Sequence, residues 1–493
     1  MTVISPVKYP DKLFIGGAWV SPAGDSIFEV VQSATEEPFE RIAEARPADV
    51  NRAVAAARSA FDDGPWPRMS HGERADYLRA IAIELERDRE ANALVWTAET
   101  GVLHKYSCGI ASSLAGTFRS YADLANTFPF EERHTPKLGG ELALVVQEPV
   151  GVVGAIVPWN GAPGLTTNKV APALLAGCTI VVKSSPEAPG SGYLLAEACE
   201  RAGLPPGVLN VITAEREASE LLVRHPEVDK IAFTGSTAAG RRIAALCGER
   251  IARCTLELGG KSPAIVFDDY DVGTAAKALA SRAILQTGQV CWSVTRVIAS
   301  QARHDALVEA LSAEFEQVTV GDPFCSEIQM GPLATNRQRE RVEALVARGK
   351  AEGAVLATGG GRPRHLQRGF FVEPTVFGNV DNRSTIGREE IFGPVLSVIP
   401  VTNDDEALTV ANDTIFGLNA AVFTNDAEKA YRFARSMRAG TVGHNGVRRE
   451  HGLPFGGFKQ SGIGREGGRE GLRPYLETKS IILDGVPSFV WPK

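Results

Sequence analysis

The chain has 493 residues, enough for two or three compact domains, and its 44% hydrophobic and 23% charged residues are ordinary for a globular protein. A net charge of -7 argues against a nucleic-acid partner, and no apolar run approaches the roughly 18 residues of a membrane span. Seven scattered cysteines lack a Cys-x-x-Cys pair, and eight histidines lack paired ligand spacing. These patterns predict a cytoplasmic protein with no secretion signal and no metal site.

The first third of the chain predicts short strands and then helices. Strands and turns are expected up to about residue 45. Apolar residues at helical spacing then predict three helices, at Pro47–Asp62, Gly72–Thr100 and Ile110–Ala125. The polar stretch Thr127–Gly140 leads into a strand pattern at Glu141–Glu148, which predicts an excursion from the main body.

From Val150 the pattern changes to alternating strands and helices. β-branched runs are separated by helical segments of about 10–15 residues; the runs are Val152–Val157, Thr179–Lys183, Val208–Thr213 and Lys230–Phe233. Such alternation predicts a parallel sheet covered by helices, with a ligand at the carboxyl ends of the strands. A second series of this kind follows Cys254–Gly260 and reaches Val442. The glycine-rich stretch Gly452–Gly471 is expected to be irregular, and Lys479–Val486 to be one more strand.

Two segments match the letters of nucleotide-binding motifs but lack the sequence context that those motifs require. Gly462–Gly467 satisfies G-x-G-x-x-G, but it follows a polar loop where the dinucleotide fingerprint requires a strand. Gly260-Lys261-Ser262 ends like a P-loop, but Thr255 stands where the first glycine must be. We therefore interpret both as ordinary loops.

Three strand ends carry residues suited to ligand binding. Phe233–Gly240 leaves a strand and opens a helix, so Gly235 and Ser236 lie where backbone N–H groups favour phosphate. An ordinary capped turn explains this stretch equally well. Asn160 ends one strand and is either a turn residue or an amide donor to an oxyanion. Lys183 ends the next strand, and taken alone a solvated lysine is the simpler reading.

Glu257 and Cys291 are the candidate base and nucleophile. Glu257 lies between leucines before a Gly-Gly turn, where burial would raise its pKa toward that of a general base. Cys291 follows Gly-Gln-Val and precedes an apolar run. Taken singly, an exposed glutamate and a structural thiol are the commoner outcomes.

Together these stretches resemble the aldehyde dehydrogenase superfamily, from Val157 onward over most of the chain. The matching pieces fall in the family's order: VPWN (157–160), AGLPPGVLNV (202–211), FTGST (233–237), LELGGKSP (256–263), GQVC (288–291), EEIFGPV (389–395), GLNAAVFT (417–424) and PFGGFKQSGIGREGG (454–468). Glu257 and Cys291 are 34 positions apart, which is the spacing expected of the family's base and nucleophile.

The resemblance implies oxidation of an aldehyde to its carboxylic acid. Cys291 would form a thiohemiacetal and then a thioester, Asn160 would hold the oxyanion, and Glu257 would activate the hydrolytic water. The resemblance also implies NAD as cofactor, with NADP not excluded. The implied cofactor-binding positions are Ile156, Pro158, Trp159, Lys183, Gly235, Ser236, Gly240, Leu258, Glu390 and Phe392.

The chain departs from the family pattern at both the cofactor and the substrate side. Pro186 stands where a glutamate often marks NAD preference, Glu187 comes one residue later, and Ala214 replaces a common glycine. Gly161 and Asn168 replace aromatic residues. Trp292, the Gly443-His444-Asn445 stretch, Arg448 and Arg449 also differ from relatives, which suggests a wider and more polar substrate entrance, although solvated loop charges are the simpler explanation of the two arginines.

Three other functions compete with this interpretation. CoA-acylating relatives tend to lack a glutamate at the Glu257 position. A cysteine hydrolase would need a histidine, and none lies in the core motifs. A catalytically silent structural relative would not be expected to retain Cys291, Glu257 and Asn160 together.

The resemblance also implies the architecture. We expect an α/β fold with a Rossmann-like cofactor-binding domain (1–126 and 148–256), an α/β catalytic domain (257–467) and a small β oligomerisation flap (127–147 and 468–493). An exposed edge of two or three strands seldom stays unpaired. The flap therefore predicts a homodimer or homotetramer.

Overall fold

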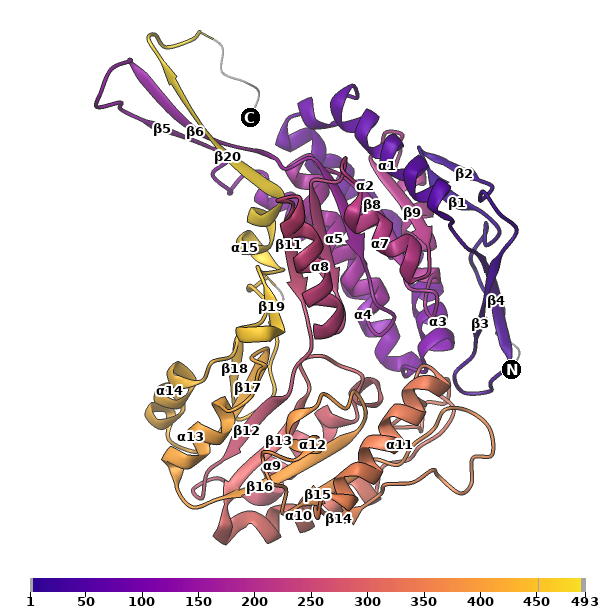
Figure 1. The fold of residues 1–493 in the computed structure, drawn as a ribbon, viewed down its shortest axis with the longest axis vertical. Helices are drawn as coiled ribbons and strands as arrows, with labels where there is room; N and C mark the ends of the chain where they lie inside the picture. The colour runs from indigo at the N-terminus through magenta and orange to yellow at the C-terminus, as the bar shows by residue number, and fades with distance from the viewer. Residues whose placement is uncertain (1–2, 451, 489–493) are drawn as a thin grey trace.

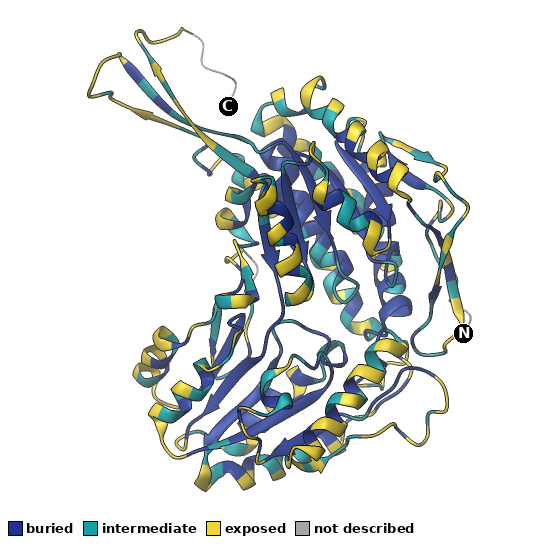
Figure 2. Ribbon diagram, viewed as in Figure 1, coloured by how far each residue is buried: buried dark blue, intermediate teal, exposed yellow. Residues whose placement is uncertain are grey.

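The computed structural model describes residues 3–450 and 452–488. Two large, mainly parallel sheets lie in the two halves of the molecule, and a small antiparallel sheet projects from the body (Figure 1). Both large sheets are dark with buried residues, whereas the outer helix faces are exposed (Figure 2). The α/β architecture predicted from the sequence is confirmed.

The first sheet has eight strands, of which the central five are parallel. In spatial order the strands are β19 (Gly462–Ile463), β11 (Arg253–Glu257), β10 (Lys230–Thr234), β7 (Val152–Ile156), β8 (Thr179–Ser184), β9 (Leu209–Thr213), β1 (Leu13–Ile15) and β2 (Ala18–Val20). Successive side chains of a strand point to opposite faces of the sheet. Val152 and Val153 accordingly belong to two different apolar clusters, one on each face. The sheet is therefore covered on both faces.

Helices fill both faces of this sheet. The cluster with Val152 includes residues of α1 (Pro47–Asp62), α7 (Arg216–Arg224) and α8 (Thr237–Glu249). The cluster with Val153 includes residues of α2 (His71–Arg87), α4 (His104–Leu124), α5 (Ala162–Ala176) and α6 (Gly190–Arg201). Helix α3 (Arg89–Thr100) packs beside α4 and α6.

Two predicted helix boundaries are wrong. The segment expected as one helix, Gly72–Thr100, breaks at Asp88, which leaves helical geometry while its carboxylate binds Arg201 of α6. Helix α4 begins at His104 rather than Ile110. The first turn of α4 is polar and so has no apolar pattern that would predict a helix. Ser107 in this turn is nevertheless buried and hydrogen-bonded to Thr97.

The second sheet has seven strands, and all its pairings except the antiparallel one between β14 and β15 are parallel. Its order is β14 (Val355–Thr358), β15 (Thr375–Gly378), β16 (Val395–Val401), β13 (Val294–Ser300), β12 (Ser262–Val266), β17 (Asn419–Phe423) and β18 (Thr441–His444). Helices α9 (Val272–Ala283) and α10 (Gln301–Glu316) pack on one face. The other face packs against α11 (Asn336–Ala351), α12 (Thr385–Arg388), α13 (Asp404–Asn412) and α14 (Ala427–Ser436).

The projecting sheet joins segments far apart in the sequence. Strand β6 (Leu142–Pro149) pairs antiparallel with β5 (Glu131–His134) and with β20 (Leu476–Leu483). The helix α15 (Gly468–Leu472) precedes β20, and β3 (Ile27–Val31) and β4 (Pro38–Ala43) form a separate hairpin. Leu138 and Ile482 of this region are exposed.

Within the described ranges, none of the helices combines the length and apolar character needed to cross a membrane. All seven cysteines are free thiols. The short segment 258–261 links the last long strand of the first sheet, β11, to the first strand of the second, β12. It therefore lies where the two halves meet.

Candidate active site

Strand register places several candidate residues at the carboxyl ends of the strands of the first sheet. Ile156 of β7 lies opposite Lys183 of β8 and Phe233 of β10, and Thr234 lies opposite Glu257 of β11. Because these strands are parallel, the residues that follow them leave the sheet on the same side. Asn160, Gly235 and Ser236 thus emerge beside Lys183 and Glu257.

The loop that carries Cys291 is held in a strained conformation. Gln286 and Thr287 both have positive φ, which is rare for residues other than glycine. A Cβ on Gly288 would lie 2.2 Å from the backbone of Gly393, so only glycine fits there. The Thr287 hydroxyl donates to the Gly331 carbonyl at 3.0 Å. Backbone contacts therefore fix the position of Cys291.

Contacts from both sheets meet at Cys291. A Cβ on Gly260, in the segment that follows Glu257, would lie 2.3 Å from the Cys291 carbonyl oxygen. The Asn160 side-chain amide donates to the carbonyl of Gln289 at 2.9 Å, and the Gln286 amide donates to the Asn160 carbonyl at 3.3 Å. The structure thus brings together the three candidate catalytic residues.

Glu257 is a buried carboxyl group, and neither oxygen has a hydrogen-bond partner among the described residues. Burial and the nearby carboxylate of Glu466 raise its pKa well above the usual value, against the opposing effect of Lys169. Lys169 forms a buried ion pair with Glu466 and donates to Thr234 at 2.7 Å. Glu257 is therefore set beside a charged pair in an apolar surrounding.

Lys169 and Glu466 were missed by sequence reasoning. Lys169 lies in α5 directly before the apolar run Val170–Ala176. A charged side chain in such a buried stretch needs a partner of opposite charge. That anomaly was the available signal. Glu466 had no such signal, because it belongs to a glycine-rich loop.

Cys291 is a weakly acidic thiol in this structure. Burial and the negative charges of Glu390 and Glu257 raise its pKa to about 12, although Arg449 acts in the opposite direction. Glu390 accepts a hydrogen bond from the Gly260 N–H at 2.9 Å, and burial raises its own pKa to about 7. The site thus favours neutral forms of its acidic groups.

The carboxyl ends of β8 and β10 carry groups that attract an anion, namely the Lys183 ammonium and the N-terminus of α8. Lys183 is buried, and burial lowers its pKa to about 8. Ser236 caps α8 by accepting from the Ala239 N–H at 3.2 Å, so the N-terminus of α8, where an anion is favoured, lies at this end of the sheet. A Cβ on Gly240 would lie 2.4 Å from the end of the Leu258 side chain, which would have to move.

Two aromatic residues border these strand ends. The rings of Trp159 and Phe392 are 5.6 Å apart, edge to face. Trp159 follows Pro158 after β7, and Phe392 has a positive φ of 61°. Trp159, Lys183 and Ser236 thus all belong to or follow parallel strands that end on the same side of the sheet.

A cavity of about 300 Å³ opens on the side of α4. Its lining includes Ser113, Gly116, Thr117, Asn168, Arg449 and Phe455. The Arg449 guanidinium lies 4.5 Å from the centre of the Phe455 ring. Gly456, the next residue, approaches Glu257 so closely that a Cβ there would lie 2.6 Å from the carboxyl oxygen. The cavity therefore borders the catalytic group.

The α4 residues of this cavity were not singled out from the sequence. Ser113, Gly116, Thr117 and Ser120 recur at helical spacing, but small polar residues are common on any exposed helix face. Only the packing of α4 beside the loop after β18 shows that they face a cavity.

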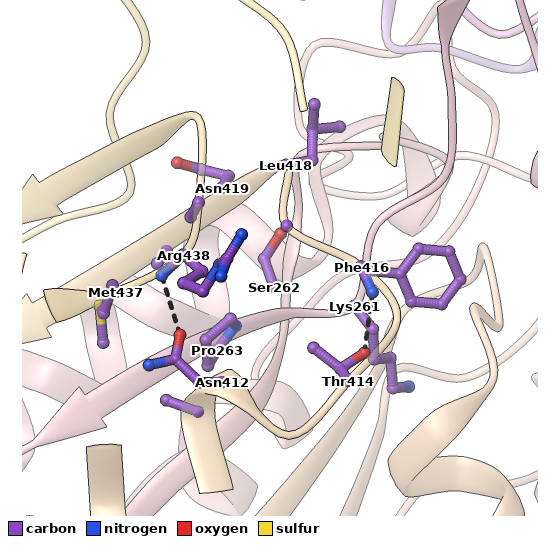
Figure 3. A pocket seen from close by; sticks show the side chains of 14 residues that line it. Lys261, Ser262, Pro263, Asn412, Thr414, Phe416, Leu418, Asn419, Met437 and Arg438 are labelled. Carbon is purple, nitrogen blue, oxygen red and sulfur yellow. Dashed lines mark hydrogen bonds between the residues drawn. The ribbon is translucent and has the colours of Figure 1, made fainter. Parts of the chain in front are cut away.

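A second, much smaller cavity lies in the other half of the molecule (Figure 3). Lys261, Ser262 and Pro263 line it together with the Asn412–Ala420 region, where Arg438 N–H donates to Asn412 at 2.8 Å. Its volume of about 10 Å³ is at most enough for one water molecule. It is therefore too small for a substrate.

Comparisons with known proteins cover nearly the whole chain. The model of the aldehyde dehydrogenase family matches residues 19–481. Geranial dehydrogenase of Castellaniella defragrans is 42% identical over 96% of this chain and 98% of its own length. The 3-succinoylsemialdehyde-pyridine dehydrogenase of Pseudomonas sp is 40% identical, covering 96% of this chain and 98% of its own. A crystal structure of a Mycobacterium tuberculosis aldehyde dehydrogenase with NAD+ is 42% identical, with a TM-score of 0.93 and coverage of 96% and 98%.

The raised pKa of Cys291 predicts slow alkylation of the free protein. Below a pKa of about 12 the reactive thiolate fraction rises tenfold per pH unit, so iodoacetamide should label Cys291 slowly near neutral pH. The rate should still be rising steadily at about pH 9. Mass spectrometry of the Cys291 peptide measures this, with the exposed thiol of Cys325 as an internal reference. A plateau below about pH 9 would contradict the prediction.

Proposed function

Because this chain belongs to the aldehyde dehydrogenase family, we propose that Cys291, Asn160 and Glu257 oxidise an aldehyde to its carboxylic acid with NAD as cofactor. The observation that carries the proposal is the convergence of these three groups where the two sheets meet. Asn160 contacts the Cys291 loop, and the segment after Glu257 packs against the Cys291 backbone.

The first step is attack of the Cys291 thiolate on the aldehyde carbon. The Asn160 amide can turn one N–H toward the developing oxyanion while the other remains on the Gln289 carbonyl, and such a donor stabilises the tetrahedral thiohemiacetal. The thiol must first lose its proton. That proton is released to the solvent, and Glu257 acts in the later hydrolysis step.

NAD held at these strand ends would supply the hydride acceptor for the thiohemiacetal carbon, and Cys291 would then carry the acyl group as a thioester. Glu257 then takes a proton from water, and the resulting hydroxide attacks the thioester carbonyl. The carboxylic acid leaves and the thiol is restored. The raised pKa of Glu257 makes its carboxylate a stronger base than that of an ordinary glutamate.

The residues at the carboxyl edge suit NAD. Lys183 would contact the ribose hydroxyls and the N-terminus of α8 would contact the pyrophosphate, with Ile156, Pro158, Trp159 and Leu258 nearby. Glu390 and Phe392 would lie near the nicotinamide end. These assignments follow the family resemblance, and the shared direction of the parallel strands supports them.

Glu257 also separates this function from its alternatives. A CoA-acylating enzyme has no use for a buried general base, and a silent relative would not need a buried carboxyl group without partners among the described residues. Hydrolysis of the thioester by water is therefore the favoured outcome.

We extend the proposal to location and assembly. The seven free cysteines support a reducing, cytoplasmic location. The projecting sheet, with exposed Leu138 and Ile482, supports a homodimer or homotetramer. The division into a cofactor-binding domain (1–126 and 148–256), a catalytic domain (257–467) and an oligomerisation segment (127–147 and 468–493) is part of the same proposal.

Replacing the proposed base should separate hydride transfer from hydrolysis. Glu257→Gln is expected to release about one equivalent of reduced nicotinamide per chain in a burst and then to turn over about 10²- to 10⁴-fold more slowly. Rapid mixing with absorbance detection measures both phases. Glu249→Gln, at the exposed end of α8, is the control with unchanged turnover. Unchanged turnover of Glu257→Gln would refute the role of Glu257.

Glu187 should determine the preference for NAD over NADP. Its carboxylate is held by Ser185 and by Arg337 at 2.7 Å, and its charge acts on Lys183. A 2′-phosphate beside Lys183 would meet this charge. Glu187→Gln should therefore raise kcat/KM for NADP relative to NAD by about tenfold, or ~1.4 kcal/mol.

The control for this prediction is Glu217→Gln, in the first turn of α7. Steady-state kinetics with both cofactors gives the ratio. An unchanged ratio in Glu187→Gln would show that the displaced glutamate has no part in cofactor choice.

The cavity beside α4 should accept the remote end of a large aldehyde. No atom lies within 4 Å of a Cβ built on Gly116, so Gly116→Leu fills the cavity without a clash. This variant should lose about tenfold in kcat/KM for octanal and little for acetaldehyde, because each buried CH₂ contributes about 0.8 kcal/mol. Gly109→Leu, an equally open position of α4 outside the cavity lining, is the control. Best activity of the unaltered protein on acetaldehyde would contradict a wide entrance.

A further inference from the structure

A group of potential metal ligands lies at the beginning of helices α3 and α4. It consists of Glu90, near the start of α3, and of His104 and Cys108, one turn apart on α4. One ligand atom from each residue lies within 4.8 Å of the other two. None of these residues takes part in the proposed oxidation.

The spacing of the three atoms approaches that of a tetrahedral zinc site. With Zn–S near 2.3 Å and Zn–N near 2.0 Å, a tetrahedral sulfur and nitrogen lie about 3.5 Å apart. The Cys108 sulfur lies 3.8 and 3.9 Å from the two ring nitrogens of His104. The sulfur–nitrogen distances are therefore only a few tenths of an ångström longer than in a tetrahedral site.

We propose that Glu90, His104 and Cys108 bind a zinc-like divalent metal ion through one carboxylate oxygen, one imidazole nitrogen and one thiolate. The donor set of one sulfur, one nitrogen and one oxygen suits Zn²⁺ and Co²⁺, whereas Mg²⁺ and Ca²⁺ take oxygen ligands. Three protein ligands leave the fourth position for water. On binding, the Cys108 thiol loses its proton to the solvent and the S–Zn bond takes its place.

The ligand groups are available for coordination. Among the described residues, the His104 ring makes no hydrogen bond other than its contact with the Cys108 sulfur. Glu90 is exposed, so its side chain can turn toward a metal ion. His104 and Cys108 are half-buried, which holds them in place and still leaves them accessible to an ion.

The charges around the group include one competitor. Arg89 contacts the Glu90 carboxylate at 3.2 Å, but both side chains are exposed and such pairs are weak. Lys105 points elsewhere, because its ammonium binds the carbonyls of Ser326 and Ile328 at 3.0 and 2.9 Å. A dication therefore has to displace only the contact with Arg89.

The proposed site is structural and lies at the junction of the two halves of the molecule. The His104 backbone N–H donates to the Pro323 carbonyl at 2.9 Å, and the His104 ring lies 5.4 Å from that of Phe324. A metal ion would therefore join α3 and α4 beside the segment 323–328, which precedes α11. Metal binding should stabilise this junction.

This inference revises the expectation of no metal site. That expectation considered pairs of histidines and Cys-x-x-Cys motifs, whereas His104 and Cys108 form a mixed pair with helical i, i+4 spacing. The third ligand comes from a neighbouring helix and is not visible in the local sequence.

The test uses the full-length protein with Cys291→Ala, which removes the thiol of the candidate active site. After treatment with a chelator and its removal, the protein is titrated with Zn²⁺ against a chromophoric chelator. One Zn²⁺ per chain is expected. Co²⁺ should give a near-ultraviolet thiolate-to-metal absorption band together with visible bands of a tetrahedral ion.

Cys108→Ser and His104→Ala, made in the same background, should weaken Zn²⁺ binding by more than about 100-fold, since loss of an outer-shell partner alone costs 10- to 100-fold. Both should abolish the Co²⁺ thiolate band. Zn²⁺ affinity of the unsubstituted site should rise with pH as the thiol ionises. Cys325→Ser, which removes an exposed thiol outside the group, should keep both signals.

Circular dichroism and metal-free melting temperature confirm that each variant is folded. The proposal is overturned if the chain binds no Zn²⁺, or if Cys108→Ser and His104→Ala bind it as tightly as their parent. Because these readouts do not use turnover, they are independent of the proposed oxidation.

Discussion

The close backbone packing around Cys291 is the constraint on which the candidate site depends. Gly260 and Gly288 both lie where a side chain would overlap neighbouring backbone, at 2.3 Å from Cys291 and 2.2 Å from Gly393. Two consecutive residues of the same loop, Gln286 and Thr287, adopt left-handed conformations that cost free energy. The tertiary contacts of both sheets must supply that free energy, so the nucleophile is positioned only in the complete fold.

Burial gives this site its second common property. The pKa values of Cys291, Glu257 and Glu390 are all raised, so each acidic group keeps its proton to a higher pH than usual. A thiol that stays protonated near neutral pH does not react before the substrate and cofactor are in place. The buried pair of Lys169 and Glu466 lies beside Glu257 and acts on its pKa in both directions, since Glu466 raises that pKa and Lys169 lowers it.

The substrate and cofactor sides of the site are built in different ways. The proposed cofactor side uses the ends of regular strands, whose register aligns Lys183 with Ile156 and Phe233, and Ser236 follows Phe233 by three residues. The proposed substrate side uses one face of α4 and the loop that carries Arg449 and Phe455. Loops and exposed helix faces tolerate substitution better than strand ends. Specificity for the aldehyde can therefore change without disturbing the parts that hold the cofactor.

The sequence by itself determined the fold class, the family and the three candidate catalytic residues, because these depend on local patterns. Strand–helix alternation predicts a parallel sheet, and the order of short motifs identifies the family. Tertiary structure decided the rest. It divided Gly72–Thr100 at Asp88 through the contact with Arg201, and it placed Lys169 beside Glu466, 297 positions away. It also brought Glu90 to His104 and Cys108. Partners far apart in the sequence leave no local pattern, so only the folded chain shows which charges and ligands meet.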